Sequence, residues 1–337
     1  MPNVRPFFST LCLLLCYFHR MNLKSMSLNN EASVPFKLTP GDKVRFVSPA
    51  STPDRKAVLM RAEILRSWGL EVDFGEHAFK KVAYLAGTDE ERLADFNTAL
   101  RDPEIRAIFA TRGGKGSYRI ADQLDFEAAQ HDPKFVVGFS DITALHLSLW
   151  KQCRLVGVHG ALMNDEKGCI SEQSISFLRS VLMTTDNITL HSRQDEQTSA
   201  LTTAGTARGI LIGGNLDMIS TAAGWALPDM RSSILLIEAV NMYLGQVDRL
   251  LTMLSKSGHL TGLAGIAIGQ FTDFKQSGDW TVIDLLREHL EPLNVPILGG
   301  LPLGHGIDPL SIPVGMTAFL DAASGELTIQ RAAKKEA

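Results

Sequence analysis

The chain has 337 residues, of which 45% are hydrophobic and 21% charged, and its formal net charge at neutral pH is -4. This composition is typical of a globular protein with room for two domains, and it excludes a fibrous or largely disordered chain. Nucleic-acid binding requires an excess of clustered lysine and arginine, so the negative charge argues against nucleic acid as a partner. A small molecule fits better.

The first 35 residues differ from the rest of the chain. The apolar run FFSTLCLLLCYF at residues 7–18 follows Arg5 and resembles a signal-peptide core, but it is too short to span a bilayer. No clear small-x-small cleavage site follows, and Met21 and Met26 offer later starts. We interpret residues 1–35 as a leader or a misassigned start of a cytoplasmic protein, with export as the alternative. No stable membrane association is expected.

After this segment, strand and helix patterns alternate. The sequence predicts a strand at residues 44–47 and a helix from Asp54 to Trp68 with Met60 on its buried face. Thr88 and Glu91 have capping-box spacing and predict another helix start. Short buried strands are predicted at residues 107–111 and 135–137. Such alternation favours parallel strands covered by helices.

A second alternating series occupies the carboxy-terminal half. Strands are predicted at residues 207–212, 234–237 and 263–268, and helices at residues 215–223, 246–255 and 282–289. The polar stretch 186–204 is the best linker candidate. We therefore predict an α/β fold with two domains: an amino-terminal parallel sheet flanked by helices at residues 36–185, and a carboxy-terminal α/β domain at residues 205–337.

The segment VVGFSDIT at residues 136–143 places a serine at a sharp strand-to-helix turn in the first domain. An apolar strand runs into Gly138-x-Ser140, and a helical pattern begins immediately afterwards. Such a nucleophile elbow exposes the serine Oγ, and the following N–H, that of Asp141, can face a developing oxyanion. The second glycine of the common esterase elbow is missing, so Ser140 as a simple helix cap is the alternative.

Two residues of the second half are candidates to complete a triad with Ser140. Glu238 ends the predicted strand 234–237, and the carboxyl end of a buried strand is where open α/β sheets bind ligands. His305 is flanked by glycines, and histidine is the residue that most often transfers protons near neutral pH. For Glu238 the alternatives are an ion pair with Arg249 or a solvated strand end, and for His305 the alternative is a solvated loop position.

The other histidines and the cysteines show no pattern typical of a metal or disulfide site. His146 in the elbow helix and His159 at a strand end are interpreted as structural. The four cysteines form no C-x-x-C pair, and no histidine cluster has ligand spacing. We therefore expect neither a disulfide scaffold nor a structural zinc site, and no metal or other cofactor.

The glycine-rich stretch TRGGKGS at residues 111–117 follows a predicted strand. It is no P-loop, because Lys115 is followed by glycine instead of serine or threonine. We expect Gly113 and Gly114 to line the active site and to form the oxyanion hole together with the N–H of the residue after the nucleophile. Arg112 or Lys115 could hold a substrate carboxylate. A plain tight turn is the alternative.

Several motifs resemble the LD-carboxypeptidase family. They are YLAGTD at residues 84–89, RGGKGS at 112–117, GFSDITALH at 138–146, GGNL at 213–216, DRLL at 248–251, GH at 304–305 and IPVG at 312–315. The resemblance runs in chain order from about residue 41 to residue 330. It implies a two-domain α/β hydrolase with Ser140, Glu238 and His305 as a Ser-Glu-His triad.

The family also implies a substrate class. It includes enzymes that release the terminal D-alanine of cell-wall tetrapeptides in peptidoglycan recycling, and relatives that inactivate peptide-nucleotide antibiotics. The hypothesis is a serine carboxypeptidase that cleaves the L-D bond of a muropeptide through an acyl-enzyme. An immunity-type hydrolase is the alternative enzyme, and a non-catalytic peptide-binding protein is the alternative from another class. A homodimer is left open.

Three residues depart from the pattern of the family that the chain resembles. Lys115 stands where an aromatic residue is usual, and Ala239 and Met242 stand where acidic residues are common. All three are expected near the cleft and leave the triad intact. They therefore bear on the choice of substrate.

Overall fold

The computed structural model describes residues 31–160, 162, 170–274 and 278–331 of the chain. Most of the expected leader lies outside these residues. Its end does not, because the Ser33 N–H donates to the Arg154 carbonyl at 2.8 Å and the Val156 N–H donates to the Ser33 carbonyl at 3.0 Å. The last residues of the expected leader therefore pair with the folded body. In the described part, no helix is long and apolar enough to cross a membrane.

The first sheet has six strands in the order β11-β5-β4-β3-β1-β2. Their bounds are β1 Lys43–Val47, β2 Glu71–Phe74, β3 Ile105–Ala110, β4 Phe135–Gly138, β5 Gly157–His159 and β11 Ile312–Val314. All neighbours pair in parallel except β11, which pairs antiparallel with β5. The sheet is accompanied by α2 Arg55–Ser67, α3 Asp89–Arg101, α4 Phe126–His131, α5 Thr143–Cys153 and α6 Glu172–Met183. Because β11 comes from the last part of the chain, residues 36–185 do not build this sheet alone.

The second sheet has seven strands in the order β10-β9-β8-β7-β12-β13-β6. Their bounds are β6 Ile188–His191, β7 Thr206–Asn215, β8 Ser233–Val240, β9 Gly265–Thr272, β10 Ile297–Leu298, β12 Thr317–Asp321 and β13 Glu326–Ile329. Strands β7 to β10 are parallel, and β12, β13 and β6 extend the sheet antiparallel. Its helices are α7 Leu216–Thr221, α8 Leu244–Lys256 and α9 Val282–Leu290. The two-sheet α/β fold confirms the predicted fold class.

The polar segment 186–204 is not an unstructured linker. It contains β6, the edge strand that pairs with β13, and the 3-10 helix η3 Gln197–Leu201. Leu190 and Leu201 from this segment are buried. A short edge strand needs few apolar side chains, so composition alone did not reveal it.

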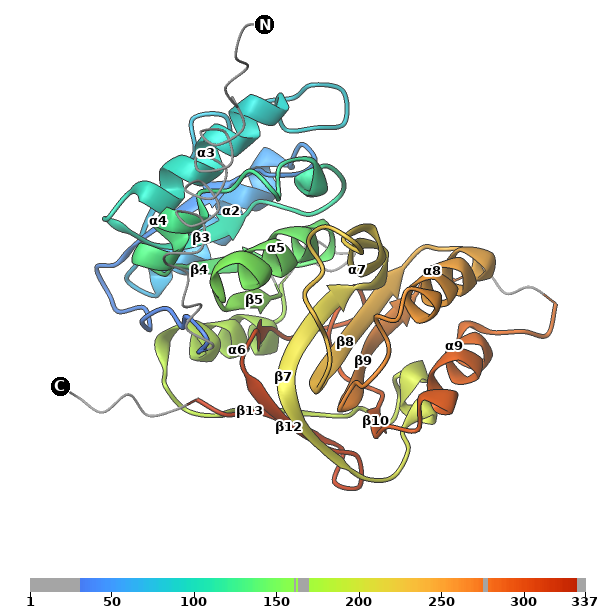
Figure 1. Ribbon diagram of the computed structural model, residues 1–337. Helices are drawn as coiled ribbons and strands as arrows, with labels where there is room; N and C mark the ends of the chain where they lie inside the picture. Colours follow the sequence, from blue (N-terminus) through green and yellow to red (C-terminus); the bar gives the residue numbers. More distant parts are fainter. Residues whose placement is uncertain (1–30, 161, 163–169, 275–277, 332–337) are drawn as a thin grey trace, which may run out of the picture. The chain divides into compact units, whose positions relative to one another are not determined.

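The elbow helix α5 lies where the two sheets meet (Figure 1). It contacts β5 of the first sheet as well as β7 and α7 of the second. Its residues from Thr143 to Trp150 are all buried, which is the pattern of a helix covered on every side. The amino-terminal end of α5 therefore holds the preceding serine turn at the boundary of the two sheets.

The helix predicted from residue 54 forms as α2, but its buried face differs from the prediction. Asp54 caps it, and the inward residues are Val58, Ala62 and Leu65, whereas Met60 is 40% exposed. The buried stripe is narrower than the apolar pattern suggested. The capping box of Thr88 and Glu91 is confirmed at the start of α3.

Candidate active site

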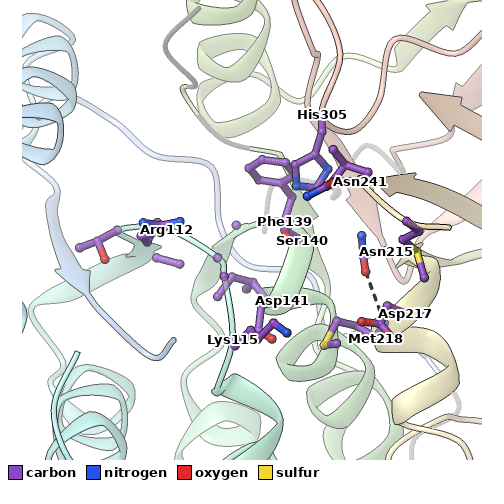
Figure 2. A pocket seen from close by; sticks show the side chains of 18 of the residues that line it. Arg112, Lys115, Phe139, Ser140, Asp141, Asn215, Asp217, Met218, Asn241 and His305 are labelled. Carbon is purple, nitrogen blue, oxygen red and sulfur yellow. Dashed lines mark hydrogen bonds between the residues drawn. The ribbon is translucent and has the colours of Figure 1, made fainter. Parts of the chain in front are cut away.

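Residues from both sheets line one cleft of about 720 Å³. It lies at the carboxyl ends of the parallel strands, where open α/β sheets bind ligands. We call residues 110–115 and 138–142 the serine wall; the histidine wall comprises residues 215–218, 240–250 and 305. The cleft is lined by every predicted site residue except Glu238. Figure 2 shows Ser140 with Arg112 and Lys115 on one side and His305, Asn241 and Asn215 on the other.

Ser140 occupies the strand-to-helix turn that the sequence predicted. It follows β4, opens the 3-10 helix η2 Ser140–Ile142, and has a backbone φ of 61°. A left-handed φ is uncommon for a residue other than glycine, and at a nucleophile elbow it projects the serine Oγ away from the strand. Ser140 is not the cap of α5, because that position is Ile142 and no side chain caps it. The simple helix-cap alternative is therefore wrong.

The glycine-rich loop lies against this serine. A Cβ added at Gly113 would be 2.9 Å from the Ser140 Cβ and 3.2 Å from its Oγ, so only glycine permits the approach. Gly114 faces Ser51 instead, and the Lys115 N–H donates to the Ser51 Oγ at 3.0 Å. The structure thus brings Gly113, but not Gly114, next to Ser140.

Buried hydrogen bonds tie the glycine-rich loop to the serine turn. The Ser117 N–H donates to Asp141 Oδ2 at 2.7 Å, and the Ser117 hydroxyl donates to the Asp141 carbonyl at 2.5 Å. Burial raises the pKa of Asp141, and the bonds from Ser117 partly counter this. The guanidinium of the buried Arg92 donates to the Gly116 carbonyl at 2.9 Å and also to the Pro49 carbonyl. The backbone of the serine wall is therefore fixed without a ligand.

His305 of the histidine wall forms a hydrogen-bonded pair with Glu238, which lies behind that wall. The distance from His305 Nδ1 to Glu238 Oε2 is 2.7 Å, and Asn215 Nδ2 donates to Glu238 Oε1 at 3.0 Å. Glu238 is completely buried behind the histidine. Burial alone would raise the pKa of Glu238, but the attraction of His305 and these hydrogen bonds outweigh burial and lower it. The alternative ion pair with Arg249 is therefore wrong.

The orientation of His305 follows from this pair. Because its Nδ1 is bound to Glu238, Nε2 is the nitrogen left to exchange a proton. The rings of His305 and Phe139 pack with centroids 4.7 Å apart, and Figure 2 shows His305 beside Phe139 and Ser140. The structure therefore brings together all three predicted triad residues, with Glu238 reaching the cleft only through the histidine.

Packing against Glu238 explains why the residue before His305 is a glycine. A Cβ at Gly304 would lie 2.8 Å from Glu238 Oε2, so the loop can pass over the carboxylate only as glycine. Glu238 itself does not end its strand, contrary to the prediction. Strand β8 continues to Val240, and its pairing with β9 is irregular between Ile237 and Ala239, on either side of the glutamate.

One contributor to the site, Asn215, was missed. Asn215, in the GGNL motif, caps α7 and bonds to Glu238, and its N–H donates to Thr143 Oγ1 at 3.0 Å. The GGNL motif marks Asn215 in the sequence, but neither its position nor its spacing predicts the contact with Glu238.

In the described residues, no group of three or more His, Cys, Asp or Glu side chains is placed to hold a metal.

The two buried histidines lie behind the serine wall. Burial lowers the pKa of His146 to about 3 and that of His159 to about 4. His146 Nε2 is 3.0 Å from the Val136 carbonyl, whereas neither ring nitrogen of His159 has a partner among the described residues. The ring of His159 packs edge-on against Phe139, with centroids 6.1 Å apart. Both rings are therefore neutral near physiological pH and lie in the core.

Comparisons with known proteins agree with this geometry. Residues 44–160 match the LD-carboxypeptidase N-terminal domain, and residues 208–320 match the LD-carboxypeptidase C-terminal domain. A putative carboxypeptidase of Synechocystis is 35% identical over 303 residues, covering 87% of this chain and 96% of that protein. A probable murein peptide carboxypeptidase of Bacillus subtilis is 31% identical over 304 residues, covering 88% and 94%.

Solved structures show the same fold. The muramoyltetrapeptide carboxypeptidase of Oxalobacter formigenes superposes with a TM-score of 0.75 at 26% identity, covering 85% of this chain and 97% of that one. A microcin self-immunity protein superposes with a TM-score of 0.77 at 24% identity, covering 88% and 98%. This chain belongs to the LD-carboxypeptidase family, and it is a serine-type carboxypeptidase.

Proposed function

We propose that this protein hydrolyses the L-D peptide bond that releases the terminal D-alanine of a cell-wall tetrapeptide, with Ser140, Glu238 and His305 as its triad. The observation that carries the proposal is the elbow serine in one cleft with a histidine whose Nδ1 is held by a buried glutamate. The named activities of the Bacillus and Oxalobacter relatives support the choice of substrate.

In the proposed reaction, His305 Nε2 accepts the proton of the Ser140 hydroxyl while Oγ attacks the carbonyl carbon of the scissile bond. Glu238 holds the imidazole in the correct tautomer and stabilises its protonated form, because the buried carboxylate has a lowered pKa and stays ionised. The protonated histidine then donates to the leaving amine. Water hydrolyses the acyl-enzyme by the same route in reverse.

The tetrahedral intermediate needs donors for its oxyanion. We assign this role to the N–H groups of Gly113 and Asp141, because Gly113 lies against the serine and Asp141 directly follows it at the start of η2. Gly114, which faces Ser51, is the weaker candidate. One such donor contributes about 3 to 4 kcal/mol to transition-state stabilisation in comparable hydrolases.

The proposed location is the cytoplasm, where recycled wall fragments would be the source of a small peptide substrate. The cleft volume of about 720 Å³ suits a short peptide better than a folded protein partner. The charged side chains on its walls also suit a peptide with free carboxylates.

A substrate panel tests the proposal. Purified protein is incubated with a muropeptide tetrapeptide, with the same peptide carrying a terminal L-alanine, and with an aminoacyl-sulfamoyl nucleoside, and the products are identified by mass spectrometry. We expect D-alanine release from the first substrate alone. Cleavage of the nucleoside conjugate in preference to the tetrapeptide would favour an immunity-type hydrolase, and binding of all three without cleavage would favour a peptide-binding protein.

A further inference from the structure

Four cationic side chains line the cleft: Arg61, Arg112, Lys115 and Arg249. In the part of the chain that the structure describes, none of them forms an ion pair with a carboxylate. Arginines elsewhere in the first sheet do have such partners: Arg45 pairs with Asp73, Arg92 with Asp89 and Arg106 with Asp132. Asp54, Asp141 and Asp217 also line the cleft, but among the described residues none of them lies within ion-pair distance of these four cations.

Arg61 is the most constrained of the four. It projects from α2, and its Nη1 donates to the Thr111 carbonyl at 2.7 Å. Its Nε is buried and has no hydrogen-bond partner among the described residues. A buried donor of a charged group without an acceptor is costly, so a further acceptor beside Arg61 would be stabilising.

Arg112 adds a second guanidinium at the same end of the cleft. Burial lowers the pKa of Arg61, and the positive charge of Arg112 lowers it further, so the two groups are close enough to repel. Asp54 opposes this shift, and its effect is the smallest of the three. The one hydrogen bond from the Arg112 side chain, to the Thr52 carbonyl, is long at 3.4 Å.

We propose that Arg61 and Arg112 together bind the free α-carboxylate of the substrate's last residue and thereby restrict cleavage to the final peptide bond. The inference rests on the proposed function, because it assigns the leaving amino acid to the serine wall. A carboxylate presents two oxygens to the paired guanidinium donors. It also offsets the repulsion between the two cations.

The sequence positions of the arginine site and of the serine wall indicate which substrate carboxylate is bound. Arg61 holds the carbonyl of Thr111, Arg112 follows directly, and Gly113 lies against Ser140. In a peptide substrate, the carboxylate of the last residue is only two covalent bonds beyond the scissile nitrogen. A carboxylate site on the residues directly before Gly113 therefore suits the terminal group better than an acidic side chain further along the peptide. The exposed Lys115 has no comparable buried donor.

Two peptides that differ only in a terminal carboxylate or carboxamide test this site. We expect the wild-type protein to cleave the carboxylate peptide with a kcat/KM at least about 100-fold higher. Arg61→Gln should lower kcat/KM for the carboxylate peptide by about 10- to 100-fold and that for the carboxamide by less than about threefold. Arg66→Gln, the matched control, removes an arginine of the same helix α2 that pairs with Glu63 outside the cleft, and it should change kcat/KM for both peptides by less than about twofold.

A fluorophosphonate, which has no carboxylate, separates this inference from the proposed function. Arg61→Gln should react with the probe at a rate within about twofold of wild type, which also shows that it is folded. If Arg61→Gln does not fold, Arg61→Lys is used instead, because lysine keeps a donor for the Thr111 carbonyl but loses the paired donors of the guanidinium. Its preference for the carboxylate peptide over the carboxamide peptide should fall by about tenfold. Equal cleavage of both peptides by wild type, or an equal loss on both in the variant, overturns the carboxylate site alone. A wild-type protein that neither reacts with the probe nor cleaves either peptide overturns the proposed function.

Discussion

Ser140 and Asp141 of the serine wall are neighbours in sequence, whereas His305 and the Glu238 that orients it are 67 positions apart. Ser140 is positioned by one strand-to-helix turn, and the next residue completes its surroundings. His305 is positioned by a loop that passes over a glutamate from a different strand. The difference teaches that the nucleophile is set by local backbone geometry and the base by tertiary packing.

This comparison predicts that neither wall works without the other. Ser140→Ala and His305→Ala should each lower kcat on the tetrapeptide by about 10⁴- to 10⁶-fold, because each removes one partner of the same proton transfer. The double variant should lose little more than the more affected single variant. Ser67→Ala, on the exposed end of α2, is the control and should be as active as wild type. Losses that multiply in the double variant would show that the two walls act separately.

The substitution Glu238→Gln tests the pair of Glu238 and His305 alone. It preserves the shape of the side chain but removes the charge that stabilises protonated His305, so kcat should fall by about 10³- to 10⁴-fold. The measurement is steady-state kinetics, with circular dichroism to verify folding. Activity equal to wild type would mean that another carboxylate orients the histidine.

Acid should destabilise the core behind the serine wall through His146 and His159. Above the unfolded-state pKa of 6.5 the rings are neutral in both states. As the pH falls below 6.5, the unfolded chain binds protons that the folded rings, with pKa about 3 and about 4, do not bind. The free energy of unfolding should therefore decrease by about 1.4 kcal/mol per pH unit for each histidine.

Urea unfolding between pH 7 and pH 5 measures this loss. His146→Gln, which keeps a donor for the Val136 carbonyl, should reduce the pH dependence by about one proton. On the histidine wall the pKa of Glu238 is lowered from 4.5, so its stabilisation is present above that pH and is lost only as the pH falls below it. A variant with an unchanged slope between pH 7 and pH 5 would mean that His146 is protonated in the fold.

Asn215→Ser should have a smaller effect. The serine retains a cap for α7 but loses the amide that donates to Glu238, and kcat should fall by about tenfold. Because that hydrogen bond lowers the pKa of Glu238, its loss should raise this pKa and move the acid limb of the pH-rate profile upward. A loss of thermal stability with an unmoved acid limb would show that Asn215 serves only as a helix cap.

The smallest expected effect is that of metal chelation. Because the proposed chemistry uses only the serine, the histidine and backbone donors, EDTA should leave kcat/KM unchanged. Activity is compared before and after dialysis against the chelator. A loss that zinc restores would contradict the triad mechanism.

The sequence revealed the serine wall better than the histidine wall, for physical reasons. A strand, a tight turn and a helix start are local patterns, so Ser140 and the glycine-rich loop could be predicted from neighbouring residues. The contact between Asn215 and Glu238 depends on pairing between β7 and β8, which no local pattern contains. The triad was assembled through resemblance to a family, and spacing alone would not have joined its members.

Outside the site, too, the sequence predicted local elements better than those that depend on tertiary contacts. The parallel strands and the capping box of Thr88 were predictable, because hydrophobic runs and caps act within a few residues. Strand β6 was missed because an edge strand in a polar segment forms only against β13, more than a hundred residues away. Met60 was predicted inward although it is exposed, because an apolar residue on a helix does not require burial.

Covalent labelling identifies the nucleophile and its dependence on the histidine. Wild-type protein is treated with a fluorophosphonate, digested, and mapped by mass spectrometry, in parallel with Ser140→Ala and His305→Ala. The account predicts a single adduct on Ser140 in the wild type, none in Ser140→Ala, and much slower labelling in His305→Ala. An adduct on another serine, such as Ser51 beside the glycine-rich loop, or equally fast labelling without His305, would contradict it.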